Sequence, residues 1–283
     1  MLIAQITDVH IGFDRDNPDE LNMQRLRAVI ARLTQGPNRP DLLLMTGDLT
    51  EAGDPDSYAR LAAAVADCPF PVHAMVGNHD DRAELVAAFP DTPIDGGFVH
   101  YAIALAGLRL IVLDTLEPGR HGGAFCAARV AWLRDQLARD RATPTFIVMH
   151  HPPIESGITW LDSAADEPWI ARFTSAVTGF DQVRGIIAGH LHRTIHTQWQ
   201  GLSLSVCPST APAVALDLTP IDEDRPDQRE LITDELPGYA LHRWDGRNLM
   251  THFEAVGRHV ALARFDRGLQ PMIKGMMAER REA

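Results

Sequence analysis

The sequence predicts an α/β protein in which two mixed β-sheets pack face to face with helices outside. Three observations lead to this prediction. Short apolar runs alternate with segments of helical spacing through the first 90 residues, which is typical of parallel strands joined by helices. Antiparallel pairs are expected in the middle and near the end of the chain. Polar residues of metal-binding type directly follow five of the apolar runs.

The first third of the chain alternates strands and helices. Residues 1–7 are apolar with little alternation, which suits a strand buried on both faces. Asp54 and Pro55 supply a cap and a first-turn proline for one of the helices. The expected elements are strands 1–7, 41–46 and 71–76 and helices 19–34, 56–67 and 81–89.

The rest of the chain mixes hairpins with further strands and helices. Ala106-Gly107 joins two runs into an antiparallel pair, and Gln200-Gly201 is expected to turn a hairpin. Residues 211–237 are rich in proline and acidic residues and show no clear element. A loop of that length is usually functional or mobile; it would be an edge loop or an oligomer contact, and a plain surface loop is favoured. The expected elements are strands 98–105, 108–114, 145–149, 183–188, 194–199 and 202–206, a last hairpin over 239–253, and helices 126–140 and 268–283.

Length and charge bound the organisation and the partners. We expect a catalytic core over residues 1–210 and a C-terminal segment, 211–283, that completes a sheet and forms a cap or an oligomer contact. No run approaches the roughly 18 apolar residues of a membrane helix, and the start lacks a signal peptide's basic region, so we expect a cytoplasmic protein without a membrane partner. The net charge of −12 disfavours long nucleic acids. Bound divalent cations would still admit a small anionic substrate.

The first two motifs supply carboxylates and an imidazole. Asp8 and His10 are two residues apart at a strand end, so both point to the same side and can hold one ion. Asp48 follows a buried strand, where a carboxylate is costly unless it is solvated or paired. Because a carboxylate has two oxygens, Asp48 is the candidate bridge between two cations.

The next motifs add an amide oxygen and further imidazoles. In Gly77-Asn78-His79-Asp80 the glycine permits a tight turn near a ligand, Asn78 offers a neutral ligand, and His79 stays beside the metals without binding one. His150 is taken as a ligand, because only one histidine of the pair with His151 can easily face the site; His151 would then support the site or face the substrate.

Two more imidazoles complete the donor set. His190 and His192 repeat the two-residue spacing and can serve one metal each. The set holds nitrogen and oxygen without thiolate, which suits Zn, Mn, Fe or Co. A pair of such ions clamps a phosphoryl group and acidifies a bridging water, whose hydroxide attacks phosphorus in line. The sequence therefore predicts metal-assisted hydrolysis of a phosphate ester, with the metals and His79 neutralising the developing charge.

These ordered blocks resemble those of the calcineurin-like metallophosphoesterase superfamily over residues 8–192. The resemblance implies a four-layer αββα sandwich and a dinuclear centre. It implies that His79 acts near the leaving group as acid or charge stabiliser and that Glu51, three residues after the bridging aspartate, orients His79. The implied ligands are Asp8, His10, Asp48 and His192 for one ion and Asp48, Asn78, His150 and His190 for the other.

Within the superfamily, the early Asp8 and the runs His150–Pro153 and Cys207–Thr210 resemble bacterial class III cyclic nucleotide phosphodiesterases and related glycerophosphodiesterases. That resemblance implies a homo-oligomer, a dimer or higher, built through C-terminal segments. We therefore expect a dinuclear phosphodiesterase for small diesters, either 3′,5′-cyclic nucleotides or glycerophosphodiesters. A phosphomonoesterase or nucleotide pyrophosphatase would use the same site. A non-catalytic scaffold is disfavoured, since no ligand is lost.

Loops after the motif strands should wall the substrate pocket, and residues 11–18, 116–123 and 152–168 are the candidates. Trp160 and Trp169 could stack on a base or pack into the core, and packing is favoured for both.

Overall fold

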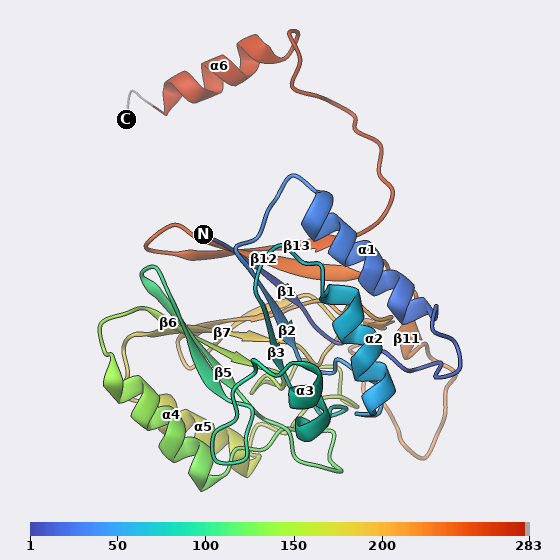
Figure 1. The fold of residues 1–283 in the computed structure, drawn as a ribbon, viewed down its shortest axis with the longest axis vertical. Coiled ribbons are helices and arrows are strands. Elements are labelled where there is room, and N and C mark those ends of the chain that lie inside the picture. The colour runs from blue at the N-terminus through green and yellow to red at the C-terminus, as the bar shows by residue number, and fades with distance from the viewer. Residues whose placement is uncertain (281–283) are drawn as a thin grey trace.

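A computed structural model describes residues 1–280 as two β-sheets packed face to face between two helical layers (Figure 1). The first sheet has the strand order β13-β12-β1-β2-β3 and the second has the order β4-β5-β6-β7-β9-β8. Strands β1 to β3 are mutually parallel, as are β5, β6, β7 and β9, while β12, β13, β4 and β8 run antiparallel to their neighbours. The predicted four-layer αββα sandwich of two mixed sheets is confirmed.

The first sheet carries the N-terminal strands and the last hairpin. Its helices α1 and α2 lie on the outer side, with α3 at the end of β3 (Figure 1). The elements are β1 (Leu2–Ile6), α1 (Leu21–Gln35), β2 (Leu42–Thr46), α2 (Pro55–Val65), β3 (Val72–Met75), α3 (Arg82–Ala88), β12 (Gly238–Trp244) and β13 (Leu249–Ala255).

The second sheet is covered on its outer face by α4 and α5 (Figure 1). Helix α5, where no helix was expected, begins with a proline in its first turn. The elements are β4 (Tyr101–Leu105), β5 (Leu108–Leu113), α4 (Ala127–Arg139), β6 (Thr145–Met149), α5 (Pro168–Val177), β7 (Val183–Ala188), β8 (Ile195–Trp199) and β9 (Leu202–Val206).

Side-chain alternation along the second sheet separates two cores. Leu110 and Val112 join the core that includes the first sheet, whereas Ile111 and Leu113 join the core beneath α4 and α5. Because successive residues of a strand face opposite sides, the fully apolar run of β5 fills both layers at once. The burial of the run on both faces explains why it lacks polar alternation.

The C-terminal region differs from the expectation in one respect. Residues 211–237 contain a two-stranded ribbon, β10 (Ala213–Val214) with β11 (Ile232–Thr233), where no element was expected. Further on, β12 pairs antiparallel with β1 and adds to the first sheet. Helix α6 (Gln270–Glu279) stands apart from the body (Figure 1), and the end of the expected helix, residues 281–283, lies outside the described residues.

No helix within residues 1–280 combines the length and the apolar character needed to cross a lipid bilayer.

Candidate metal centre

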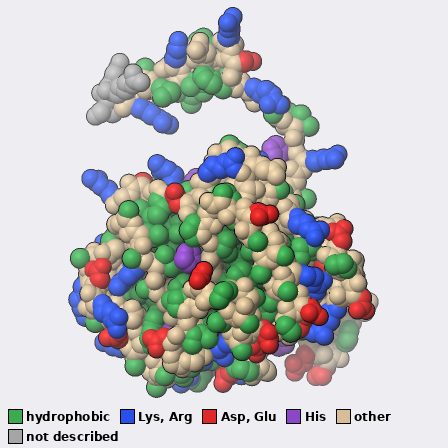
Figure 2. All heavy atoms as spheres, in the orientation of Figure 1, with side chains coloured by type: hydrophobic (Ala, Val, Ile, Leu, Met, Phe, Trp, Pro, Cys, Tyr) green, Lys and Arg blue, Asp and Glu red, His purple; other side chains and the backbone are tan. Residues whose placement is uncertain are grey.

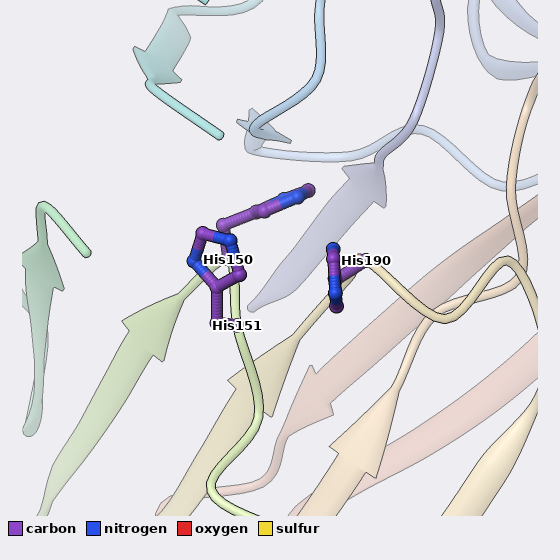
Figure 3. Close-up of side chains that lie close together, drawn as sticks. All are labelled: His150, His151 and His190. Carbon is purple, nitrogen blue, oxygen red and sulfur yellow. The ribbon is translucent and has the colours of Figure 1, made fainter. Parts of the chain in front are cut away.

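The candidate ligands all follow strands whose carboxyl ends meet at one edge of the sandwich. Parallel strands place the residues after them at the same edge of a sheet, and the two sheets bring their edges together. Figure 3 shows this for the imidazoles that follow β6 and β7. The candidates are Asp8 and His10 after β1, Asp48 after β2, Asn78 after β3, His150 after β6, and His190 and His192 after β7.

The backbone at these positions adopts a conformation that side chains usually avoid. Seven non-glycine residues of the described chain have positive φ, and five of them are candidate ligands. Such residues cluster at functional sites, where the surrounding structure holds the strain in place. The five are Asp8 (φ 51°), His10 (φ 50°), Asp48 (φ 49°), His190 (φ 72°) and His192 (φ 52°).

One group of donors joins the ends of β1 and β7. One ligand atom each from Asp8, His10 and His192 lies within 4.8 Å of the other two. His192 Nε2 is 3.3 Å from Asp8 Oδ1 and 3.2 Å from His10 Nε2. Three donors at these separations face one another closely enough to share a single cation.

A second group joins the ends of β2 and β6. Asp48 Oδ2 is 3.2 Å from His150 Nε2, and Asp8, Asp48 and His150 offer ligand atoms within 4.8 Å of one another. His190 lies beside His150 and His151 in a further group of that size (Figure 3). Asp48 Oδ2 is also 3.7 Å from His10 Nε2, so this carboxylate lies between the two groups, as does Asp8, which belongs to both.

Hydrogen bonds fix the orientation of three imidazoles. The Nδ1 atoms of His150 and His192 each donate to a backbone carbonyl, Thr46 O at 2.9 Å and Pro212 O at 2.9 Å. His10 Nδ1 lies 2.8 Å from a Glu51 carboxylate oxygen. When Nδ1 carries the hydrogen, Nε2 keeps its lone pair, which is the form that binds a metal.

Asn78 and His151 are connected to each other. His151 Nε2 lies 3.1 Å from Asn78 Oδ1 and 3.0 Å from His121 O, and His151 Nδ1 lies 2.7 Å from the Thr115 hydroxyl. Both ring nitrogens of His151 therefore have partners. This arrangement suits a residue that supports its neighbours, as the sequence had indicated.

Two glycines make room for the donors. A methyl group on Gly77 would overlap Asp48 Oδ1, and one on Gly47 would overlap the ring of His150. Gly47 also has a φ of 93°, which glycine adopts without strain.

Two atoms at the centre, one of a carboxylate and one of an imidazole ring, lack a hydrogen-bond partner, which fits the binding of a cation. Asp8 Oδ1 and His150 Nε2 are buried and have no well-aligned hydrogen bond from any residue of 1–280. Burial raises the pKa of Asp8, but His192 and His150, when protonated in the metal-free protein, outweigh it and bring that pKa to about 2. Burial and the charge of His150 lower the pKa of His190 to about 3. The carboxylate is thus ionised and the His190 imidazole neutral, as metal ligands must be. Burial lowers the pKa of His150, but the charges of Asp48 and Asp8 raise it to about 9, so a cation binding there would displace a proton.

Glu51 contacts two histidines in different ways. Its carboxylate lies 2.8 Å from His10 Nδ1 and 3.9 Å from His79 Nδ1. His79 Nδ1 instead donates to the backbone carbonyl of Glu51 at 2.8 Å, and the His79 amide donates to Asp48 Oδ1 at 2.9 Å. The short contact of the carboxylate is with a candidate ligand, and the backbone of Glu51 orients His79.

Asp80 is the last residue of the Gly77–Asp80 motif, and no role was predicted for it. The buried carboxylate accepts hydrogen bonds from the amides of Leu49, Thr50 and Gly77 and from the Tyr58 hydroxyl at 2.7 Å. Burial and the charge of Asp48 raise its pKa. Asp80 therefore ties the loops after β2 and β3 together. Helical spacing makes Tyr58 a core residue and gives no sign of this contact.

Five of the candidate ligands, His10, Asp48, Asn78, His190 and His192, line a cavity of about 600 Å³. The three expected loops contribute Phe13, His121 and Trp160 to its walls, and residues 211–214 and Ile232 form a further wall that the sequence did not indicate. Trp169 is buried in the second core, as expected, but the packing expected of Trp160 is wrong, because 40% of this side chain is exposed on the cavity wall.

The fold and the site together define a class of protein. Two mixed sheets bring carboxylates and imidazoles to one edge, with an open cavity above them, and this donor set is the one that metal-dependent hydrolases use.

Comparisons with known proteins identify the family. Residues 1–194 match the family model described as calcineurin-like phosphoesterase. The chain is 36% identical over 214 residues to a probable cyclic nucleotide phosphodiesterase of Synechococcus sp., covering 74% of this chain and 80% of that protein. It is 27% identical over 264 residues to a probable glycerophosphodiester phosphodiesterase of Arcobacter nitrofigilis, covering 91% and 94%.

A solved structure shares the fold. A dimetal phosphatase from Danio rerio superposes with a TM-score of 0.61 at 14% identity, covering 91% of this chain and 99% of that one. The protein belongs to the calcineurin-like phosphoesterase family, and it is a hydrolytic enzyme.

Proposed function

We propose that this enzyme is a dinuclear, metal-dependent phosphodiesterase that hydrolyses small phosphodiesters, either 3′,5′-cyclic nucleotides or glycerophosphodiesters. One observation carries the proposal. The Asp48 carboxylate lies between two groups of donors, 3.7 Å from His10 Nε2 and 3.2 Å from His150 Nε2. Relatives named as cyclic nucleotide and glycerophosphodiester phosphodiesterases support the choice of a diester.

The donors divide into two sets that share Asp48. His10 and His192 lie close together on one side and His150 on the other, which supports the division. Nitrogen and oxygen donors without thiolate suit Mn, Fe, Zn or Co. We assign Asp8, His10, Asp48 and His192 to one ion and Asp48, Asn78, His150 and His190 to the other.

The residues of the chain hold and orient the reacting groups. His79 lines the cavity, and its hydrogen bond to the Glu51 carbonyl fixes the ring beside Asp48. From there the imidazole can give a proton to the leaving oxygen or balance its charge. Two bound metal ions would supply the remaining chemistry, because they lower the pKa of a water molecule and neutralise the negative charge on the phosphoryl oxygens.

A pair of chromogenic esters tests the reaction class. Protein loaded with Mn²⁺ or Zn²⁺ should hydrolyse bis(p-nitrophenyl) phosphate and lose this activity with a chelator. Cleavage of p-nitrophenyl phosphate alone would contradict the proposal and favour the phosphomonoesterase. Inactivity on both esters, with no bound metal, would favour the scaffold.

We propose that the C-terminal segment forms the predicted oligomer contact. Figure 2 shows apolar side chains along α6, and Met272, Met276 and Met277 are more than half exposed there. Such a surface suits a second copy of the chain. A molar mass of one chain by light scattering would contradict this role. The cytoplasmic location, the two-part division at residue 210 and the exclusion of long nucleic acids stay predictions.

A further inference from the structure

The cavity has an apolar half that the reaction itself does not use. Beyond the metal donors its wall is formed by side chains from three separate segments, which follow β1, precede α5 and flank the ribbon of β10 and β11 (Figure 1). These residues are Phe13, Leu21, Trp160, Leu161, Ala211, Pro212, Val214 and Ile232.

Four of these side chains form what we call the apolar rim: Phe13, Leu21, Trp160 and Ile232. Their exposed fractions are 75%, 54%, 40% and 54%. Large apolar side chains that are left in water around one cavity mark a binding surface more often than chance exposure does. The occupant of the rim is constrained, because the same cavity ends at the metal donors.

Two polar groups of this wall, those of Glu20 and Asn22, are already engaged, whereas the exposed carboxylate of Asp14 also lines the cavity. The Glu20 carboxylate accepts hydrogen bonds from the amides of Gly12 and Asp14 at 2.7 and 2.9 Å, and the Asn22 amide donates to His10 O at 2.8 Å. Within residues 1–280, the cavity lining includes neither lysine nor arginine. A second phosphate would therefore find no lysine or arginine at the rim.

Hydrogen bonds hold the part of the wall formed by residues 211–235 next to the metal donors. Arg25 is buried and donates to the carbonyls of Thr210, Ala211 and Glu235, so it holds both ends of the segment that carries Pro212 and Ile232. The Pro212 carbonyl in turn accepts from His192 Nδ1. The distance from the donors to this part of the wall is thus set by buried hydrogen bonds.

We propose that the apolar rim is a specificity subsite that takes a flat, uncharged ring on the substrate's phosphodiester. This inference rests on the proposed function and selects among its substrates. A ring can lie against the Trp160 indole and the Phe13 phenyl while its ester reaches the donors. A quaternary ammonium is the competing occupant, since aromatic faces attract cations. The Asp14 carboxylate would attract such a cation, whereas the aliphatic majority of the wall favours the ring.

Substrate pairs test the rim through selective kinetics. In Mn²⁺-loaded protein we expect Trp160→Ala to raise the KM for 3′,5′-cyclic AMP by about tenfold, the loss of one stacked ring, with kcat little changed. The KM for glycerophosphoethanolamine, which has no ring, should stay within about twofold of the wild-type value. Ile94→Ala is the matched control, because Ile94 is an exposed apolar residue (47%) that does not line the cavity.

A second measurement does not depend on catalysis. Adenosine has the ring but no phosphate, and it should quench tryptophan fluorescence in the wild type and not in Trp160→Phe. Quenching that is equal in both proteins, or equal KM changes for both diesters, would overturn the proposal while leaving the phosphodiesterase in place. A preference for glycerophosphocholine that Trp160→Ala removes would overturn it in favour of the cation.

Two outcomes distinguish this inference from the proposed function and from a role of the rim as an interface between copies. If only monoesters are hydrolysed, the proposed function fails, and adenosine quenching still decides whether the rim binds a ring. If Phe13→Ala or Trp160→Ala changes the molar mass of the protein in solution, the rim is an interface between copies and the subsite is refuted.

Discussion

At the metal centre, which we call the floor because several of its donors line the cavity, Asp8, Asp48, His150 and His190 are buried, and three of them have positive φ. At the apolar rim, Phe13 and Ile232 are more than half exposed and have no polar partner to fix them. The floor is held from several sides, by backbone carbonyls, by close-packed glycines and by neighbouring charges. The comparison shows that one cavity combines a fixed reaction site with a wall whose side chains can be exchanged at little cost to the fold.

The largest effect is expected at the floor. Asp48→Ala should lower diester turnover to the uncatalysed background, a loss of at least about 10³-fold, because the carboxylate shared by both donor groups is removed. Metal content by mass spectrometry should fall as well. Asp56→Ala, at an exposed position of α2, should change neither. Full metal content with activity retained in Asp48→Ala would refute the ligand assignment.

Removing the metal should lower the stability of the protein through the floor and not through the rim. Buried carboxylates that face each other need a cation, so chelation should cost about 2.7 kcal/mol if metal is present at 100 times its dissociation constant. For a chain of this size that amounts to a drop in Tm of about 5–10 °C by calorimetry. Trp160→Ala should show the same drop as the wild type. An equal Tm with and without chelator would show that the floor is stable without ions.

A smaller effect is expected at Glu51, whose carboxylate contacts the candidate ligand His10. Glu51→Ala should reduce kcat by about 10- to 100-fold by releasing the His10 ring. Glu51→Gln keeps an oxygen that can accept from His10 Nδ1 and should recover much of the loss, whereas a purely charge-dependent role would leave it as inactive as alanine. Metal affinity, titrated with Mn²⁺, should follow the same order of variants.

The smallest effect is expected at Arg25, whose hydrogen bonds hold the wall of residues 211–235 next to the metal centre. Arg25→Met removes the donors that hold residues 211–235, and it should raise the KM for an aromatic diester about three- to tenfold with kcat preserved. Trypsin should then cut faster at Arg225 and Arg229. Arg27→Met, on the exposed side of the same helix, is the control. Unchanged KM and proteolysis would show that the wall does not depend on Arg25.

Much of the fold could be predicted from local sequence patterns. Apolar runs such as Leu42–Thr46 are long enough to form buried strands, and a cap like Asp54 before Pro55 marks a helix start, because both signals depend on neighbours in the chain. The candidate ligands were readable for a related reason. A parallel strand delivers the residue after it to a known edge of its sheet, so Asp8, Asp48 and Asn78 could be placed together from the sequence.

Other features depended on tertiary structure alone. No local signal indicates that the Glu51 carboxylate lies closer to His10 than to His79, that Asp80 joins two loops, or that Trp160 stays exposed while Trp169 is buried. Each of these results from contacts between segments far apart in sequence. The sequence by itself determined which chemistry meets at the strand ends, because strand direction is a local property. Only the packing of loops such as 211–237 across the site decided the shape of the cavity, because loop positions depend on partners such as Arg25 that the local chain does not reveal.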